Sequence, residues 1–175
     1  VVNLRREAKK RGVNPWRLVF TPRMSMEKHL ARFRIADLFL DTFPYNAHTT
    51  ASDALWAGLP VLTCAGETFA SRVAGSLLTA IGLPELITTS PADYEALAVR
   101  LARSPAKLAG LRKRLQKNRL TAPLFDSPRF TRHIESAYRM MWEVYLKGEA
   151  PHRMDVPALP LSGKNASRTP ARKRA

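Results

Sequence analysis

The sequence predicts an α/β fold in which a parallel β-sheet carries helices on both faces. Three short apolar runs, at 38–40, 61–63 and 86–88, have the length and composition of buried strands. Segments with helical periodicity lie between these runs, and parallel strands need such crossover connections. A further run at 17–20 predicts another short strand ahead of the first. The alternation of strands and helices therefore indicates βαβ units.

Capping residues define most of the predicted helix boundaries. Ser90, Ser104 and Ser127 each precede a proline, and an N-cap serine followed by proline is favoured at a helix start. We expect the last two of these helices to span about 105–118 and 128–147. Glycines predict the ends of three helices, at 2–11, at 67–81 and just before residue 58. Ser25 predicts the start of a further helix, which runs to about residue 35.

The stretch 37–63 carries the main functional signal. After the strand at 38–40, a turn leads into a helix that opens at 48–50, and this loop and first turn are rich in small hydrogen-bonding groups: Asn46, His48, Thr49, Thr50, Ser52 and Asp53. A helix N-terminus offers unpaired N–H groups and the positive end of the helix dipole, so it suits a phosphate or another anion. The alternative is that Thr49 or Thr50 simply caps the helix.

Ligands of open parallel sheets bind beyond the carboxyl ends of the strands. The loop after Leu40 lies at such an end, and a strand at 17–20 would place the loop at 21–25 beside it. We therefore expect the two loops to converge on one crevice, formed by Met24, His29, Arg32, His48, Thr49, Thr50 and Asp53.

The net charge of +15 is concentrated at the two ends of the chain. Residues 1–34 hold ten Lys and Arg against two acids, and residues 151–175 hold six against one, whereas 35–150 is nearly balanced. Since aromatic residues are not interleaved with the arginines, this distribution favours solvated ends over a nucleic-acid interface. A non-catalytic basic module that binds nucleic acid through both ends is the alternative from another functional class.

The sequence argues against several other classes of protein. It has no run of 18 apolar residues and no signal-peptide pattern, so we expect no membrane association. The single cysteine, Cys64, permits no disulfide within the chain and fits a reducing, cytoplasmic location. There is no Asp-x-Asp and no cluster with metal-ligand spacing, and we expect neither a metal nor another cofactor.

The two ends of the chain have distinct predicted characters. The last helix carries a broad apolar stripe that requires a large partner surface: Phe130, Ile134, Tyr138, Met141, Trp142 and Tyr145. Residues 151–175 lack periodicity and are predicted to be a disordered basic tail. The first residue is not a methionine and the first helix has no N-cap, so we expect a piece of a longer polypeptide.

Several blocks of the sequence resemble the O-linked N-acetylglucosamine transferases, including the SPINDLY-type and bacterial tetratricopeptide-repeat members. The blocks are Asp-Leu-Phe-Leu-Asp-Thr from residue 37, Asn-Ala-His-Thr-Thr from 46, Asp-Ala-Leu-Trp-Ala-Gly-Leu-Pro-Val from 53, Gly-Glu-Thr-Phe-Ala-Ser-Arg-Val-Ala from 66 and Pro-Leu-Phe from 123. They occur in the family's order and spacing, and the similarity runs from about residue 3 to 150.

The resemblance implies the carboxyl-terminal, Rossmann-like lobe of a GT-B glycosyltransferase, with residues 1–150 as a partial nucleotide-sugar-binding lobe. It further implies metal-independent, inverting transfer of N-acetylglucosamine from UDP-N-acetylglucosamine to Ser or Thr hydroxyls of acceptor proteins. The expected partners are a UDP-sugar, the acceptor proteins, and the amino-terminal catalytic lobe and repeat domain of the same polypeptide. GDP-fucose or another donor stays an alternative, as in SPINDLY-type relatives.

The resemblance also assigns roles to individual residues. His48, Thr49 and Thr50 match family positions around the diphosphate, and Asp53 matches the carboxylate on the ribose. His29, Arg32 and Met24 match positions at the base, while Met26 departs from a frequent lysine, which leaves the choice of nucleotide open. Without the resemblance, His29 is an exposed helical histidine and Asp53 an acid in the first helical turn. Catalytic acceptor-side residues and a phosphate-binding lysine are expected upstream of Val1, so the chain alone should have no transferase activity.

Overall fold

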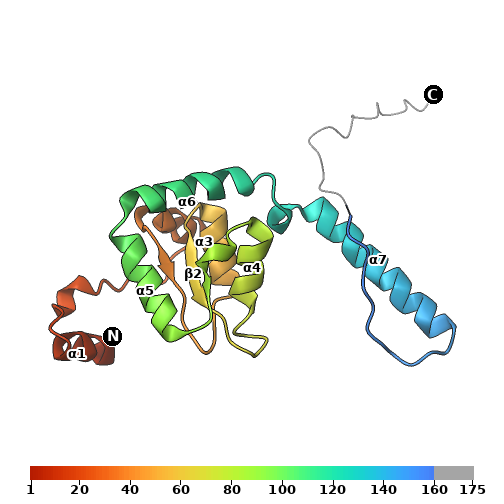
Figure 1. Ribbon diagram of the computed structural model, residues 1–175, viewed down its shortest axis with the longest axis horizontal. Helices are drawn as coiled ribbons and strands as arrows, with labels where there is room; N and C mark the ends of the chain where they lie inside the picture. The colour runs from red at the N-terminus through yellow and green to blue at the C-terminus, as the bar shows by residue number, and fades with distance from the viewer. Residues whose placement is uncertain (160–175) are drawn as a thin grey trace.

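The computed structural model describes residues 1–159, and it confirms the parallel α/β sheet (Figure 1). Strands β1 (Phe39–Leu40), β2 (Val61–Cys64) and β3 (Ile87–Thr88) lie in the order β1-β2-β3, and both pairings are parallel. Phe39 is paired with Val61, and Thr63 with Ile87. Because β2 is central, all four of its residues are buried, whereas Leu40 on β1 is exposed.

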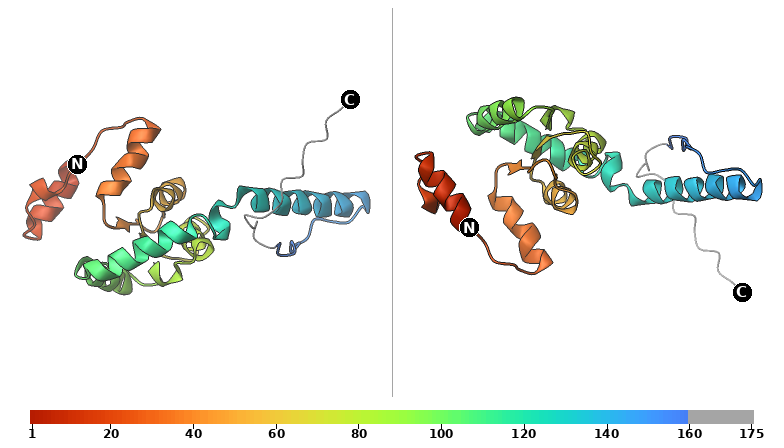
Figure 2. Two further views of the ribbon diagram at one scale, coloured as in Figure 1. Left: turned by 90° about the horizontal axis from the view of Figure 1, so that it is seen from above. Right: turned by 90° about the horizontal axis from the view of Figure 1, so that it is seen from below.

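Helices cover both faces of this sheet. The crossovers through α3 (Thr49–Ala57) and α4 (Val73–Ile81) run in the same direction across the sheet, so both helices lie on one face, where they pack together. Helix α5 (Pro91–Ala102) packs on β2 and β3 from the other face, which Figure 2 shows from above and below.

The segment before β1 differs from the prediction. Helices α1 (Val2–Lys10) and α2 (Met26–Arg32) are present, with short 3-10 turns η1 (Pro15–Arg17) and η2 (Phe33–Ile35). The predicted strand at 17–20 is wrong: residues 18–20 are irregular, and Val19 is 82% exposed. A strand is stabilised by pairing, and β1 pairs with β2 alone within the described residues.

The predicted helix at 67–81 begins late, at Val73. Residues 66–72 instead form a compact turn, in which the Ser71 N–H donates to Thr68 Oγ1 at 3.2 Å and the Ser71 hydroxyl donates to the Thr68 carbonyl at 2.9 Å. Such hydroxyl bonds compete with helical backbone bonds. The buried residues of α4 are Ala74, Gly75, Leu78 and Ile81.

The predicted helix boundaries hold more often than the predicted caps, since Ser25 and Ser104 occupy N-cap positions but make no side-chain cap bond. Ser90 accepts the N–H of Asp93 at 3.1 Å and α6 (Pro105–Asn118) begins after Ser104, whereas α7 (Ser127–Leu146) is capped by Asp126 instead of Ser127. Asp126 accepts the N–H of Arg129 at 3.1 Å. Gly58 and Gly82 end α3 and α4 with φ of 89° and 76°, a conformation that favours glycine.

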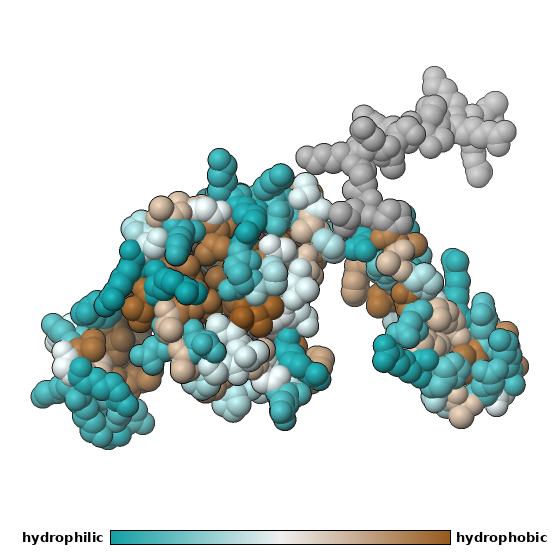
Figure 3. All heavy atoms as spheres, in the orientation of Figure 1, coloured by the Kyte–Doolittle hydropathy of each residue, from teal (hydrophilic) through white to brown (hydrophobic). Residues whose placement is uncertain are grey.

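Helix α6 closes the amino edge of the sheet with side-chain donors. Arg112 donates to the Ala36 carbonyl before β1, and Asn118 donates to the Ile81 carbonyl at the end of α4, at 2.8 Å. Arg119 donates to the Trp56 carbonyl in the last turn of α3. These bonds satisfy backbone carbonyls that a helix end leaves unpaired. In Figure 3 hydrophilic side chains gather along the top, over α6.

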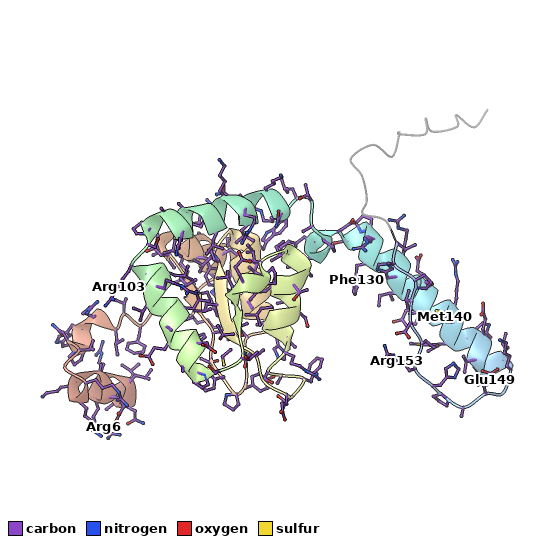
Figure 4. All side chains as sticks on the ribbon, viewed as in Figure 1. Arg6, Arg103, Phe130, Met140, Glu149 and Arg153 are labelled. Carbon is purple, nitrogen blue, oxygen red and sulfur yellow. The ribbon has the colours of Figure 1, made fainter. Side chains whose placement is uncertain are left out.

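Helix α7 projects away from the sheet (Figure 1). Its predicted apolar stripe is exposed, and Figure 4 shows Phe130 and Met140 along the helix and Arg153 on the segment that returns beside it. That segment, 151–159, has no helix or strand, but Leu159 N–H donates to His133 Nε2 at 3.0 Å and its carbonyl accepts from Arg129 at 2.8 Å. The rest of the predicted disordered tail, 160–175, lies outside the described residues.

Replacing Leu115 should test how far the fold depends on α6. Leu115 is fully buried (0% exposed) in the core between α6 and the sheet layers, so Leu115→Ala should lower the free energy of unfolding by about 2–5 kcal/mol. Leu120→Ala is the matched control, because Leu120 is 64% exposed and should cost less than about 0.5 kcal/mol. Urea denaturation of the two variants measures both values, and equal losses would contradict this placement of α6.

Candidate functional site

The N-terminus of α3 lies at the carboxyl end of β1, as predicted. Residues 41–48 connect the two elements, and His48 occupies the N-cap position without making a side-chain cap bond. Thr49 and Thr50 are the first two helical residues and are exposed, so the alternative in which one of them caps the helix is wrong. The first N–H groups of α3 have no intrahelical acceptors. These groups and the positive end of the helix dipole face the carboxyl edge of the sheet.

A buried carboxylate holds the loop that leads to this helix. Asp41 Oδ1 accepts the N–H groups of Thr42 and Ala47, at 2.8 and 2.7 Å, and so joins the two ends of the loop. Its other oxygen, Oδ2, accepts the hydroxyl of Thr63 on β2 at 2.7 Å. The Asn46 side-chain amide in turn donates to Thr63 Oγ1 at 2.8 Å. Asp41, Asn46 and Thr63 are 4%, 1% and 0% exposed.

The carbonyl of Ala70 joins this loop to the turn that precedes α4. It accepts the N–H of Asn46 at 3.3 Å and lies 3.3 Å from His48 Nε2. Because a carbonyl can only accept, His48 must carry a proton on Nε2 to make this bond. Two exposed aromatic rings flank the imidazole: Tyr45 is stacked on it with a centroid distance of 5.3 Å, and Phe69 meets it edge-on at 6.0 Å.

Asp53 lies in the second turn of α3, not in the first turn as the dipole interpretation requires. Its side chain is half-buried, and it forms no hydrogen bond or ion pair with the described residues. An acid beyond the first turn gains little from the helix dipole. The carboxylate is therefore available to accept hydrogen bonds from a ligand.

Helix α2 packs against α3. The predicted site residues on α2, however, form their hydrogen bond and ring contact with neighbours in their own part of the chain and not with the predicted site residues on α3. Arg32 donates to the Thr21 hydroxyl at 2.8 Å, and the His29 ring meets Phe33 edge-on at 4.8 Å. Met24 is half-buried in the irregular segment before α2. The loop at 21–25 does not follow a strand, so the argument from two neighbouring strand ends is wrong for this half of the crevice.

Sequence reasoning missed the residues beneath the site, namely Asp41, Thr63 and Tyr94. The hydroxyl of Tyr94 donates to the Asp41 carbonyl at 2.8 Å. Burial, and next electrostatic interaction with Asp41 and Cys64, raise the pKa of Tyr94 to about 12. One signal was available in the sequence, since Thr63 is a polar residue inside the apolar run of β2 and a buried hydroxyl requires a partner.

Two absences complete the description of residues 1–159. No group of three or more His, Cys, Asp or Glu side chains gathers there in a way that could hold a metal ion. Over the same residues, none of the helices has the length and apolar character needed to cross a membrane.

Comparison with known proteins gives consistent matches. The family model described as glycosyl transferase family 41 matches residues 2–134. A probable UDP-N-acetylglucosamine–peptide N-acetylglucosaminyltransferase of Arabidopsis thaliana is 41% identical over 156 residues, which cover 89% of this chain and 16% of that protein. The UDP-N-acetylglucosamine–peptide N-acetylglucosaminyltransferase of Caenorhabditis elegans is 38% identical over 146 residues, covering 83% of this chain and 13% of its own length.

A solved structure extends the similarity to three dimensions. A mutant of the O-GlcNAc transferase of Thermobaculum terrenum superposes with a TM-score of 0.79 at 36% identity. The match covers 85% of this chain and 29% of that one. The chain thus spans about 13–16% of the length of the curated relatives it matches.

The raised pKa of Tyr94 predicts a pH-dependent stability. The folded state holds the phenol proton up to about pH 12, whereas an unfolded tyrosine releases it near pH 10, so stability should fall as the pH rises from about 10 to about 12. Tyr94→Phe should remove this dependence, and loss of the bond to the Asp41 carbonyl should cost about 1 kcal/mol near neutral pH. Urea denaturation from pH 8 to 11 measures both effects, and equal slopes for the two proteins would contradict the assignment.

Proposed function

The chain belongs to glycosyl transferase family 41, and on that basis we propose that it forms the donor-binding lobe of a protein O-N-acetylglucosaminyltransferase. One observation carries the proposal: the exposed, uncapped N-terminus of α3 at the carboxyl end of β1. The names of the relatives, which describe transfer of N-acetylglucosamine from UDP to peptide, supply the donor and the class of acceptor.

Each predicted site residue has a role in this proposal. The N–H groups at the start of α3 and the hydroxyls of Thr49 and Thr50 bind the diphosphate, with the positive end of the helix dipole behind them. Asp53 accepts hydrogen bonds from the ribose hydroxyls, which its lack of a protein partner within 1–159 supports. His29 and Arg32 on α2, and Met24 in the segment before it, contact the nucleobase.

The His48 side chain has a different role from its backbone. Its imidazole is engaged with the Ala70 carbonyl and the Tyr45 ring, so it holds the loop in place. The backbone at His48, as the N-cap residue, then sets where the first N–H groups of α3 are directed.

The chemistry requires stabilisation of a leaving group. The bond between the anomeric carbon and the β-phosphate oxygen breaks, and its electron pair leaves with UDP. The Ser or Thr oxygen of the acceptor forms the new bond on the opposite face of the sugar and loses its proton to a base. Negative charge grows on the β-phosphate in the transition state, so fixed donors at the start of α3 stabilise that state more than the ground state.

The remaining parts of the proposal concern the whole polypeptide. We infer that an amino-terminal catalytic lobe and tetratricopeptide repeats supply the base, a phosphate-binding lysine and the acceptor surface. The single cysteine supports a cytoplasmic location, and hydrogen-bond donors at α3 allow the reaction to proceed without a metal. Residues 1–150 then form the lobe, with the basic segment from 151 as its extension.

Calorimetric titration of the full-length polypeptide tests the donor site. We expect binding of UDP and UDP-N-acetylglucosamine, and Asp53→Ala should weaken UDP binding about tenfold, because two hydrogen bonds to the ribose are lost. Asp93→Ala is a matched control, since Asp93 is an exposed acid in the first turn of another helix and its loss should leave the affinity unchanged. Preference for GDP over UDP would instead support the fucosyl alternative. Unfolding of Asp53→Ala with intact affinity in the folded fraction would make Asp53 structural.

The isolated chain should have no transferase activity. Residues 1–175 contain the proposed donor site but not the acceptor-side base, so transfer of N-acetylglucosamine to a Ser- or Thr-containing peptide should stay at the level of a blank without protein. A radiolabelled donor measures this transfer, with the full-length polypeptide as the positive control. Turnover by the isolated chain would contradict the assignment of the catalytic residues to the rest of the protein.

A further inference from the structure

We propose that Asp41, Thr63 and Asn46 form a positioning device that fixes the first N–H groups of α3 against the diphosphate. This inference rests on the proposed function, and it assigns a role to three residues outside the donor contacts. None of the three is exposed enough to bind the ligand itself. Their effect must therefore pass through the loop at 41–48 and the start of α3.

The β1 ladder is short. Only Phe39 and Leu40 are in β1, and the last backbone bond of the pairing runs from the Asp41 N–H to the Leu62 carbonyl at 3.0 Å. Beyond it the chain leaves the sheet. The bond from the Thr63 hydroxyl to Asp41 Oδ2 continues the connection between the two strands one residue further, to the point where the loop begins.

The same carboxylate closes the loop. Asp41 Oδ1 accepts the N–H groups of both Thr42 and Ala47, so the residue that directly follows β1 also fixes the residue before the N-cap of α3. The Thr42 hydroxyl adds a bond to the Tyr45 carbonyl at 3.1 Å. A displacement of Asp41 would thus be transmitted to the backbone at His48 and to the N–H groups that follow it.

The donors and acceptors around Thr63 permit a single arrangement of its hydroxyl proton. The Asn46 amide nitrogen donates to Thr63 Oγ1 and to the Cys64 carbonyl, at 2.8 and 2.9 Å. Thr63 therefore accepts from Asn46 and uses its own proton for Asp41. The position requires a hydroxyl: serine can replace threonine, whereas valine has the same shape but leaves the Asp41 oxygen and the Asn46 amide without this partner.

Backbone donors are sensitive to small displacements. An N–H group binds a phosphate oxygen well within a narrow range of distance and angle, and a shift of a few tenths of an ångström weakens every bond in the group together. The ribose and the base, in contrast, contact Asp53 and α2 in the proposed site. Loss of the network should therefore reduce affinity for the diphosphate more than affinity for the nucleoside.

The test compares UDP with uridine on variants of the full-length polypeptide. Affinities for both ligands are measured by ligand-observed NMR titration, and folding is followed by urea denaturation. Thr63→Val should weaken UDP binding about tenfold and leave uridine binding within about twofold. Thr63→Ser, the matched control, should restore the wild-type ratio of the two affinities. A role confined to fold stability would lower the denaturation midpoint without changing this ratio.

The outcomes separate this inference from the proposed function. Wild-type protein that binds neither ligand would contradict the donor site itself. A wild-type ratio for Thr63→Val, or equal weakening of both ligands, would overturn the positioning role while leaving the donor site intact. If Thr63→Val does not fold, Asn46→Ala is measured in its place, because it leaves the Asp41–Thr63 bond and removes the two bonds that the Asn46 amide donates. The same shift in ratio is expected, and its absence would overturn the inference.

Discussion

The parallel pairing of β1 with β2 is the constraint on which the rest of the site depends. It places the end of β1 beside the centre of the sheet, so the loop at 41–48 and the start of α3 face the carboxyl edge, where parallel sheets bind ligands. A ladder of two residues is weak by itself. Its extension by a buried carboxylate and a threonine hydroxyl explains why Asp41 and Thr63 are retained in the interior, because each of the two is satisfied by a partner that also holds the loop.

Basic residues concentrate at the opposite, amino edge of the sheet, although the central part of the chain is nearly neutral as a whole. Residues 35–150 are nearly neutral as a whole, yet 100–119 contain eight Lys and Arg and no acid, while 35–99 contain seven acids and Arg72 as their single basic residue. Helix α6 lies where α3 and α4 end, at the negative ends of their dipoles. Arg112 and Arg119 are thus explained in part by the carbonyls to which they donate. The nucleic-acid alternative concerns the two ends of the chain, which these bonds do not test.

Sequence reasoning succeeded where a local signal decides the structure. Ser-Pro pairs and glycines determine caps through the backbone of a few residues, so the boundaries at Ser90, Gly58 and Gly82 were predictable. It failed where the decision is made at a distance: the apolar run at 17–20 lacks a strand to pair with in the described chain. It also failed at 66–72, where local hydroxyl bonds between Thr68 and Ser71 replace the first turns of the predicted helix. The exposed helix start was found because its residues are polar and consecutive. The network beneath it was missed, because Asp41 and Thr63 are 22 positions apart.

The charge of the site has a consequence for how a diphosphate can bind there. Residues 35–99, which include the α3 N-terminus and Asp53, are acidic overall. The side chains of this segment therefore do not attract an anion. Within this segment the attraction must come from oriented N–H groups and the helix dipole, which are strong at contact and weak beyond one turn. Longer-range attraction can come from the basic residues of 1–34, ten against two acids, some of which α2 brings to the side of α3. Recognition at contact then depends on the geometry of a few backbone groups, and this is why the buried residues that set that geometry matter as much as those that touch the ligand.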